Sequence, residues 1–413
     1  MPNKEISTLP DESALGILCT WLGQIPIGQQ PIPKCKIPSD WGGFSSADWE
    51  QLVSKAYNQG LAPLMYWVLS KSGSFISIPE SERNLLRAIY SGTWIKNQNI
   101  FKELEALAKA FKQASIQLVV LKGACVALTV YPDIGLRPMA DLDVLIPCSK
   151  MHQAINIAKS LGYLEHFKSE PEFSYLDHHV CLYKSCIPGI ALELHEELIA
   201  TNSYKFAVPM NWFWNQTEPM DSSFSKRRLE NLLMLTPTAQ VLYVATHAML
   251  QHGGKDALLR WFYDLDRLIR SYKESLDWNL LLSQARIFNW GSALEAALNK
   301  TVACFETPIP EQVLSSLSGI SDRNQQLVAL KQIRPTTHLL MERQELLSMK
   351  STARIRYLLA LVVPSPAFMH RRYQMKSPWM IPLYYIIRWW DIIKDCLRSL
   401  ISIFKKGSRD IRV

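Results

Sequence analysis

Between residues 115 and 197 the spacing of apolar residues changes from the helical period of the flanking sequence to the shorter period of strands. A segment with the spacing of an amphipathic helix, 149–161, lies between the second and third of these strand patterns. The last two patterns enclose a turn sequence that contains Pro-Gly, which is typical of a hairpin. The predicted strands are 116–121, 142–146, 178–183 and 190–195. A compact α/β module with a mixed sheet is therefore expected.

Helical patterns fill most of the remaining sequence, so the predicted fold class is α+β, with the module embedded between helical regions. Ser46 is the expected N-cap of the helices in 46–71, and a long helical pattern follows in 79–114. The chain turns helical again after about residue 225, with helices expected at 237–252 and 256–272. The expected division is an N-terminal helical region 1–114, an α/β core 115–225, a helical domain 226–350 and a tail 351–413.

Composition narrows the partners and the compartment. The 45 Lys and Arg against 37 Asp and Glu give a net charge of +8, which suits a partner that carries phosphates. Residues 1–350 show no long basic stripe interleaved with aromatics, so there is no strong nucleic-acid signal. Eight scattered cysteines without a CxxC pair or secretory signal predict a cytoplasmic protein with reduced thiols. The sequence contains no run of about 18 uncharged apolar residues, so no transmembrane helix is predicted.

Two acids begin the second predicted strand. Asp141 and Asp143 stand at i and i+2, which places both side chains on one face of a strand. Neighbouring carboxylates repel each other, and a divalent cation such as Mg²⁺ removes that penalty. The repulsion also predicts that Asp143→Asn leaves the metal-free protein equally stable or more stable. The competing interpretation of a bare pair is two solvated surface acids.

A third acid follows on the last predicted strand. Glu193 and His195 share one face of that strand, while the leucines between them share the other. Three carboxylates on neighbouring strands are what a two-metal phosphoryl-transfer site requires. His195 is either a group that orients a metal ligand or binds the acceptor, or a strand histidine with an ordinary hydrogen bond. His179 is expected to border the same pocket, because its strand should pair with that of Glu193.

Phosphate-binding candidates precede the acids. Lys122 and Gly123 lie at a strand-to-helix turn, where glycine permits close backbone approach and a helix N-terminus attracts phosphate. Arg137 is placed to clamp phosphate oxygens with its two-pronged guanidinium. Together these residues predict a triphosphate site beside the carboxylates.

These motifs, in this order, resemble the uncharacterised nucleotidyltransferase family of the polymerase-β-like superfamily. The matching segments are Leu121-Lys122-Gly123, Tyr131-Pro132, Gly135-Leu136-Arg137, Asp141-Leu142-Asp143 and Glu193-Leu194-His195. The resemblance implies a minimal nucleotidyltransferase fold with Asp141, Asp143 and Glu193 as catalytic metal ligands. It also implies an NTP substrate and Mg²⁺ or Mn²⁺. The superfamily usually carries Gly-Ser or Gly-Gly at the phosphate turn, so here Lys122 would act as a point charge in place of the missing serine hydroxyl.

The expected reaction is Mg²⁺-dependent transfer of a nucleoside monophosphate from an NTP to an unidentified small-molecule, protein or lipid-linked acceptor, with release of pyrophosphate. The main alternative is a catalytically silent interaction protein that keeps the fold, favoured by the missing serine. A nucleic-acid polymerase or tRNA-end enzyme is the third hypothesis, and the lack of a basic stripe disfavours it.

Other polar clusters have simpler interpretations. His178, His179 and Cys181 superficially suggest zinc, but they cross a predicted hairpin without a closed four-ligand spacing. His247 and His252 are five residues apart, so they are expected as helix-surface or cleft residues rather than metal ligands. Arg260 and Asp264 have the i, i+4 spacing of an ordinary helix ion pair, and the less favoured interpretation is a role in closing the nucleotide cleft.

The C-terminal segment predicts one amphipathic helix over 379–404. Its polar stripe is narrow and its apolar arc is wide, so it either docks into a core or contacts an anionic membrane surface or a hydrophobic partner. A docked helix would bury Trp389 and Trp390, whereas an interfacial helix would leave part of that aromatic face exposed. Four tail cations favour anionic lipid: Lys405, Lys406, Arg409 and Arg412.

Overall fold

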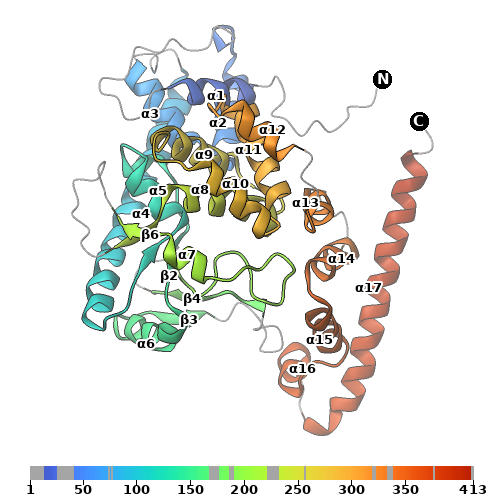
Figure 1. Ribbon diagram of the computed structural model, residues 1–413. Helices are drawn as coiled ribbons and strands as arrows, with labels where there is room; N and C mark the ends of the chain where they lie inside the picture. Colours follow the sequence, from blue (N-terminus) through green and yellow to red (C-terminus); the bar gives the residue numbers. More distant parts are fainter. Residues whose placement is uncertain are drawn as a thin grey trace.

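The computed structural model confirms an α+β fold, a mixed sheet flanked by helices with further helices at both ends (Figure 1). It describes residues 14–25, 41–72, 75, 78–166, 176–185, 190–220, 232–254, 257–318, 322–332, 338–374 and 377–410. Parts of the sequence expectations fall outside these residues: the first 13 residues of the N-terminal helical region, the Pro-Gly turn at 188–189, the start of the expected helix 256–272 and the last three residues of the tail, which include Arg412.

The sheet has seven strands in the order β3-β4-β5-β2-β1-β7-β6. Their bounds are β1 Val119–Val120, β2 Asp141–Leu145, β3 Leu164–His166, β4 His179–Tyr183, β5 Ala191–His195, β6 Thr217–Pro219 and β7 Leu233–Leu235. The four predicted strands are confirmed as β1, β2, β4 and β5. Strands β4 and β5 pair antiparallel, while β2 and β5 run parallel with Asp143 opposite Glu193. The two acidic strands are therefore direct neighbours in the middle of the sheet.

Four helices precede the sheet: α1 Ala14–Gln24, α2 Ser46–Asn58, α3 Ala62–Ser72 and α4 Glu80–Gln113. The predicted N-cap was wrong by one residue, because Ser45 caps α2. The Ser45 backbone N–H donates to Asp48 over 2.9 Å, and the Asp48 N–H donates back to the Ser45 hydroxyl over 3.3 Å. Helix α4 packs the apolar face of its second half, including Phe101 and Leu104, into the same buried cluster as the central strands.

Further helices lie between the strands and after them along the chain. Helix α5 spans Lys122–Thr129, α6 Met151–Ser160 and α7 Asn211–Asn215. Helix α8, Pro237–Thr246, continues into a π-helical turn, η6, at His247–Gln251. The next helices are α9 Leu259–Ser271, α10 Trp278–Ile287, α11 Gly291–Phe305, α12 Glu311–Leu317 and α13 Gln325–Gln332. Helices α8, α9 and α11 share a large apolar core with α1 and α3, so the N-terminal helices are part of the same body.

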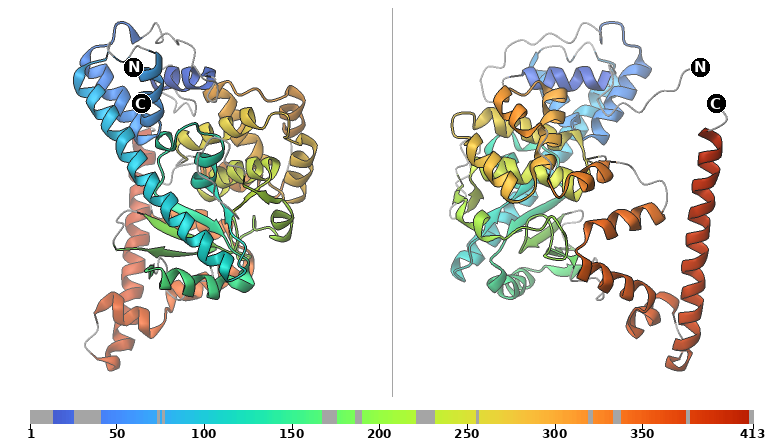
Figure 2. Two further views of the ribbon diagram at one scale, coloured as in Figure 1. Left: turned by 90° about the vertical axis from the view of Figure 1, so that its left-hand side faces the viewer. Right: turned by 45° about the vertical axis from the view of Figure 1, so that its right-hand side comes forward.

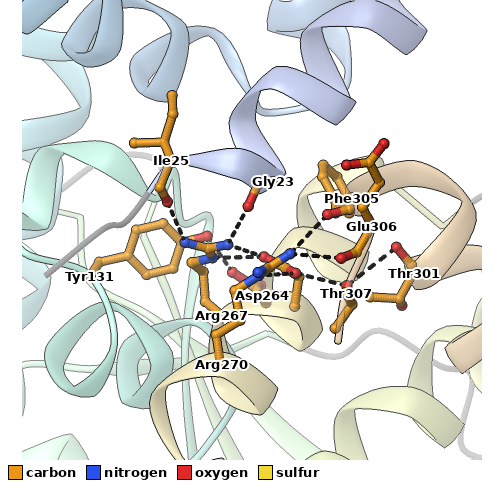
Figure 3. Close-up of polar contacts among 11 residues, drawn as sticks. Gly23, Ile25, Tyr131, Asp264, Arg267, Arg270, Thr301, Phe305, Glu306 and Thr307 are labelled. Carbon is orange, nitrogen blue, oxygen red and sulfur yellow. Dashed lines mark hydrogen bonds and ion pairs between the residues drawn. The ribbon is translucent and has the colours of Figure 1, made fainter. Parts of the chain in front are cut away.

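A buried polar network holds α9 against the C-terminal ends of two other helices, α1 and α11 (Figure 3). Arg267 donates to the carbonyl oxygen of Gly23, in the last turn of α1, over 3.4 Å and to that of Ile25, just after α1, over 3.1 Å. Arg270 donates to the carbonyl oxygens of Phe305 and Glu306 at the end of α11, both over 3.0 Å. Because buried charges are tolerated only when their hydrogen bonds are satisfied, this network orients α9 firmly. Helix α9 also carries side chains of the pocket described below.

The tail forms four further helices: α14 His338–Ser348, α15 Ser351–Val362, α16 Pro366–Tyr373 and α17 Ile381–Asp410. The predicted terminal helix is confirmed, and it extends beyond residue 404. Figures 1 and 2 show α17 as the outermost helix, far from the sheet. Within the described residues, no helix is long and apolar enough to cross a membrane.

Candidate functional site

Three acids meet at the wall of one pocket of about 330 Å³: Asp141, Asp143 and Glu193. Asp141 and Asp143 lie two residues apart on β2, and Glu193 is the direct neighbour of Asp143 on β5. All three side chains therefore project from the same face of the sheet. One ligand atom each from Asp143, Glu193 and His195 lies within 4.8 Å of the others. Asp141 lines the same pocket but belongs to no such close group, so the structure brings Asp143, Glu193 and His195 together and places Asp141 beside them.

Asp143 is held by two nitrogen donors. Its Oδ1 lies 2.8 Å from Lys122 Nζ and 2.8 Å from His195 Nε2. Burial would raise the pKa of Asp143, but Lys122 and the hydrogen bond from His195 outweigh it and lower that pKa to about 2. These contacts favour the opposite of the expectation that Asp143→Asn leaves stability unchanged or raised, because the closest neighbours of this carboxylate are attractive. Asp141 bears the repulsion instead: burial and the Asp143 charge raise its pKa to about 6.

Three histidines stand beside the acids. His195 extends the acidic face of β5, and His179 is its direct neighbour on β4. The Nε2 atoms of His179 and His195 lie 3.5 and 3.6 Å from Glu193 Oε2. His178 joins them in a second group whose ligand atoms lie within 4.8 Å of one another, and burial together with His195 lowers the pKa of His178 to about 2. Imidazole nitrogens of His179 and His195 thus lie next to carboxylate oxygen. Cys181 belongs to neither of these two groups.

The turn from β1 into α5 aims Lys122 at the acids. Lys122 has a φ of +42°, a left-handed conformation that costs a non-glycine residue about 1 to 3 kcal/mol. A Cβ on Gly123 would lie 2.0 Å from Nη1 of Arg137, so this position requires glycine. The group that approaches the Gly123 backbone is therefore the guanidinium of Arg137.

Arg137 forms a buried ion pair with Asp264 of α9. Arg137 Nη2 donates to Asp264 Oδ2 over 2.8 Å, and its Nε lies 3.2 and 3.3 Å from the two carboxylate oxygens. Tyr131 also donates to Asp264, over 2.8 Å. The expected pairing of Arg260 with Asp264 was wrong, because Arg137 reaches that carboxylate from a distant part of the chain. Arg260 instead lines the pocket, and its buried Nε has no hydrogen-bond partner among the described residues.

His247, Gln251 and His252 also line the pocket. The backbone N–H of His252 donates to the carbonyl oxygen of His247 over 3.4 Å, an i to i+5 bond of the π-helical turn. The rings of these two histidines lie 4.7 Å apart. A π turn widens the helix, so residues five apart can lie on one side of it, and such turns are frequent at functional sites. The structure places both histidines in the cleft, one of the two positions that the spacing predicted.

The comparison with family models agrees with this geometry. A model described as an uncharacterised nucleotidyltransferase family matches residues 45–306. The chain belongs to this family. The match runs from the N-cap of α2 to the end of α11, so it includes the sheet, the three acids and the whole pocket. No curated protein matches the chain.

Membership gives this nucleotidyltransferase its general chemistry, nucleotidyl transfer, and implies an NTP substrate. Sequence patterns favoured an ordinary ion pair for Arg260 and gave a cleft role second place, whereas the structure places both Arg260 and Asp264 in the pocket lining. Burial and the nearby charge of Arg137 lower the pKa of Arg260 to about 10, as expected for a cation without a close carboxylate partner. The tail from α14 onward lies outside the family match.

Proposed function

We propose that the protein transfers a nucleoside monophosphate from an NTP to an acceptor, with release of pyrophosphate, through divalent metal held by Asp141, Asp143 and Glu193. The observation that carries this proposal is the meeting of three carboxylates from adjacent parallel strands at one pocket wall. Their oxygens suit Mg²⁺ or Mn²⁺, and their burial explains why a cation would be favourable there. A metal held there would neutralise charge on the triphosphate and lower the pKa of the acceptor hydroxyl.

The protein groups have separate roles in this reaction. The acceptor oxygen attacks the α-phosphorus, a new P–O bond forms, and the bond from the α-phosphorus to the bridging oxygen breaks. Glu193 accepts the proton of the attacking hydroxyl, and pyrophosphate leaves. Lys122 and Gly123 stand at the start of α5, where backbone N–H groups and the lysine charge attract phosphate.

Arginines complete the phosphate site. Arg137 lines the pocket, but its Nε and Nη2 donate to Asp264. We therefore assign Arg137 two roles: it fixes α9 beside the pocket, and it contacts the triphosphate from one side. Arg260 also lines the pocket, and its Nε is unpartnered, so we assign it the direct phosphate contact. An N–H that is already buried and has no acceptor gains a hydrogen bond when an anion enters the pocket.

His195 bears on the identity of the metal. It offers nitrogen within 4.8 Å of ligand atoms of Asp143 and Glu193, and nitrogen ligands favour Mn²⁺ and later transition metals over Mg²⁺. We expect His195→Asn to weaken Mn²⁺ binding by about tenfold or more and Mg²⁺ binding much less. Calorimetric titration with each ion measures the two affinities, and His152→Asn, at an exposed position of α6, is the control. Equal losses for both ions would leave His195 only a structural role.

A second cavity of about 610 Å³ adjoins the first, and Arg260 lines both. Lys96 of α4 and Tyr57 of α2 also line it. Arg260 and Lys96 lie close enough for each charge to act on the other, and burial with this repulsion lowers the pKa of Lys96. We assign this cavity to the acceptor, and its two cations favour an acceptor that carries an anionic group.

A variant that fills this second cavity tests acceptor binding separately from nucleotide binding. Gly92 lines the cavity, and a Cβ there meets no atom within 4 Å, so Gly92→Leu adds bulk without strain against its neighbours. We expect this variant to bind NTP with Mn²⁺ as tightly as the original chain while transfer falls at least tenfold. Fluorescent-nucleotide titration and pyrophosphate release check the two parts. Unchanged transfer would place the acceptor elsewhere.

The experiment that tests the function directly is an incubation with each of the four NTPs, labelled at the α-phosphate, and Mn²⁺, together with co-purified material. We expect label from at least one NTP to become attached to that material, and pyrophosphate to appear in equal amount. Glu193→Gln should give neither product. Pyrophosphate release that persists in Glu193→Gln would show that another site causes it.

A further inference from the structure

One side of α17 carries an exposed apolar stripe. Six large side chains of α17 and of the 3-10 turn just before it, Pro378–Met380, are between 48% and 93% exposed: Trp379, Leu383, Ile386, Trp390, Ile393 and Leu397. Spacings of three and four residues keep the five on α17 on one side of the helix, and Trp379 stands four residues before the first of them. Monomeric soluble proteins rarely expose a continuous apolar surface of this extent. The stripe therefore needs a partner outside the described residues.

The opposite side of α17 is already fixed to the tail. Arg388 donates to the carbonyl oxygen of Leu361 over 2.7 Å, and Trp389 Nε1 donates to that of Val362 over 2.8 Å. The guanidinium of Arg388 also stacks over the Phe368 ring. These contacts to the end of α15 and to α16 set the rotation of α17, so the stripe faces away from them. Figure 2 shows no other helix beyond α17 on its outer side.

Helix α15 exposes a second apolar stripe with the same spacing. Ile355, Leu359 and Val362 are all exposed on it, at i, i+4 and i+7. The prediction that a docked terminal helix would bury Trp389 and Trp390 against residues 280–350 is not met, since both are exposed. The tail thus presents apolar and aromatic side chains from two helices.

The charge of the protein is concentrated in this same tail. Residues 351–413 contain 12 Lys and Arg against 3 Asp and Glu, whereas residues 1–350 contain 33 against 34. The whole positive charge of the chain therefore lies in the segment that exposes the stripes. A segment with net charge +9 repels a second copy of itself and attracts a negative surface.

We propose that α17 docks the protein on an anionic membrane surface, lying in the plane of the headgroups with its exposed stripe inserted. Tryptophan suits this boundary because its ring is apolar and its N–H is polar, and the stripe contains Trp379 and Trp390. Lys394 and Arg398 follow the stripe along the same helix, where they can meet lipid phosphates. The helix lies on the surface and does not cross it. This proposal is independent of the reaction assigned to the pocket.

Vesicle sedimentation of the full chain tests it. We expect binding to phosphatidylcholine vesicles that contain phosphatidylserine, weaker binding at high salt, and little binding to phosphatidylcholine alone. The variant with Leu383→Glu and Trp390→Glu should bind at least tenfold less. The control variant with Ile95→Glu and Ile287→Glu, which are exposed on α4 and α10, should bind like the original chain.

Three results would overturn the proposal. The first is no binding to anionic vesicles, or equal binding by both double variants. The second is a dimer in sedimentation velocity that Leu383→Glu with Trp390→Glu dissociates, which would make a second copy the partner. The third is RNA or DNA binding that is as strong as vesicle binding and insensitive to the two glutamates. Circular dichroism and thermal melting of each variant confirm that the fold is intact.

Discussion

Asp143→Asn is expected to reduce nucleotidyl transfer about a thousand-fold, because it removes a metal-binding charge that supplies several kcal/mol of transition-state stabilisation. The structure adds a second expected effect. Asp143 accepts from Lys122 and His195, both over 2.8 Å, so the variant leaves a half-buried lysine without its closest counter-charge. We expect its free energy of unfolding to fall by about 1 to 2 kcal/mol.

Pyrophosphate release with saturating NTP and Mn²⁺ measures the first effect, and urea unfolding in chelator measures the second. Glu165→Gln is the matched control, since Glu165 is an acid on β3 whose partner, Lys159, is exposed. It should change neither quantity appreciably. Turnover by Asp143→Asn close to that of the original chain would remove this residue from the metal site.

Arg137→Met is expected to have the largest effect on stability, a loss of about 3 to 5 kcal/mol. It leaves the buried carboxylate of Asp264 with only Tyr131 as a partner, and an unpaired buried charge is strongly unfavourable. Replacing both partners, with Arg137→Met and Asp264→Leu, should restore much of the loss, because neither charge is then left alone.

Urea unfolding of the two single variants and the double variant gives the coupling between the partners. Lys159→Ala, in an exposed pair, is the control and should cost less than about 1 kcal/mol. Additive losses in the double variant would mean that Arg137 and Asp264 contribute independently, and would contradict the buried-pair account.

The central part of the fold could be predicted because its signals are local. Alternation within β2 put Asp141 and Asp143 on one face of that strand. The register that pairs Asp143 with Glu193 of β5 comes from the structure, and no pattern within one strand predicts it. Strands β3, β6 and β7 were missed, since each has three residues and too few positions to show alternation. β1 is only two residues long within its apolar run, because ladder pairing and not the run of valine and leucine sets a strand's length.

The contacts of the pocket depend on pairs that are distant in sequence. Arg137 and Asp264 are 127 residues apart, so only the packing of α9 against the turn after α5 brings them together. Spacing within α9 favoured Arg260 as the partner of Asp264, but tertiary packing brings Arg137 to that carboxylate instead. The π-helical turn at His247–Gln251 is similarly invisible to rules based on the α-helical period.

The tail shows the same limit. Its amphipathic pattern predicted one helix, and α17 confirms it. The same amphipathic pattern fits a helix whose apolar side is buried and one whose apolar side is exposed. Which of the two forms depends on the elements that lie beside the helix in space. The carbonyl oxygens of Leu361 and Val362 hold the other side, which leaves Trp390 exposed.

The central claim is that Asp141, Asp143 and Glu193 hold divalent metal for an NTP. Its most direct test is a Mn²⁺ titration followed by electron paramagnetic resonance, with and without a non-hydrolysable NTP analogue. The account predicts that the original chain and Glu165→Gln bind Mn²⁺, more tightly with the analogue, and that Asp143→Asn and Glu193→Gln do not. Absence of Mn²⁺ binding by the original chain with the analogue present would contradict the account and favour a catalytically silent protein.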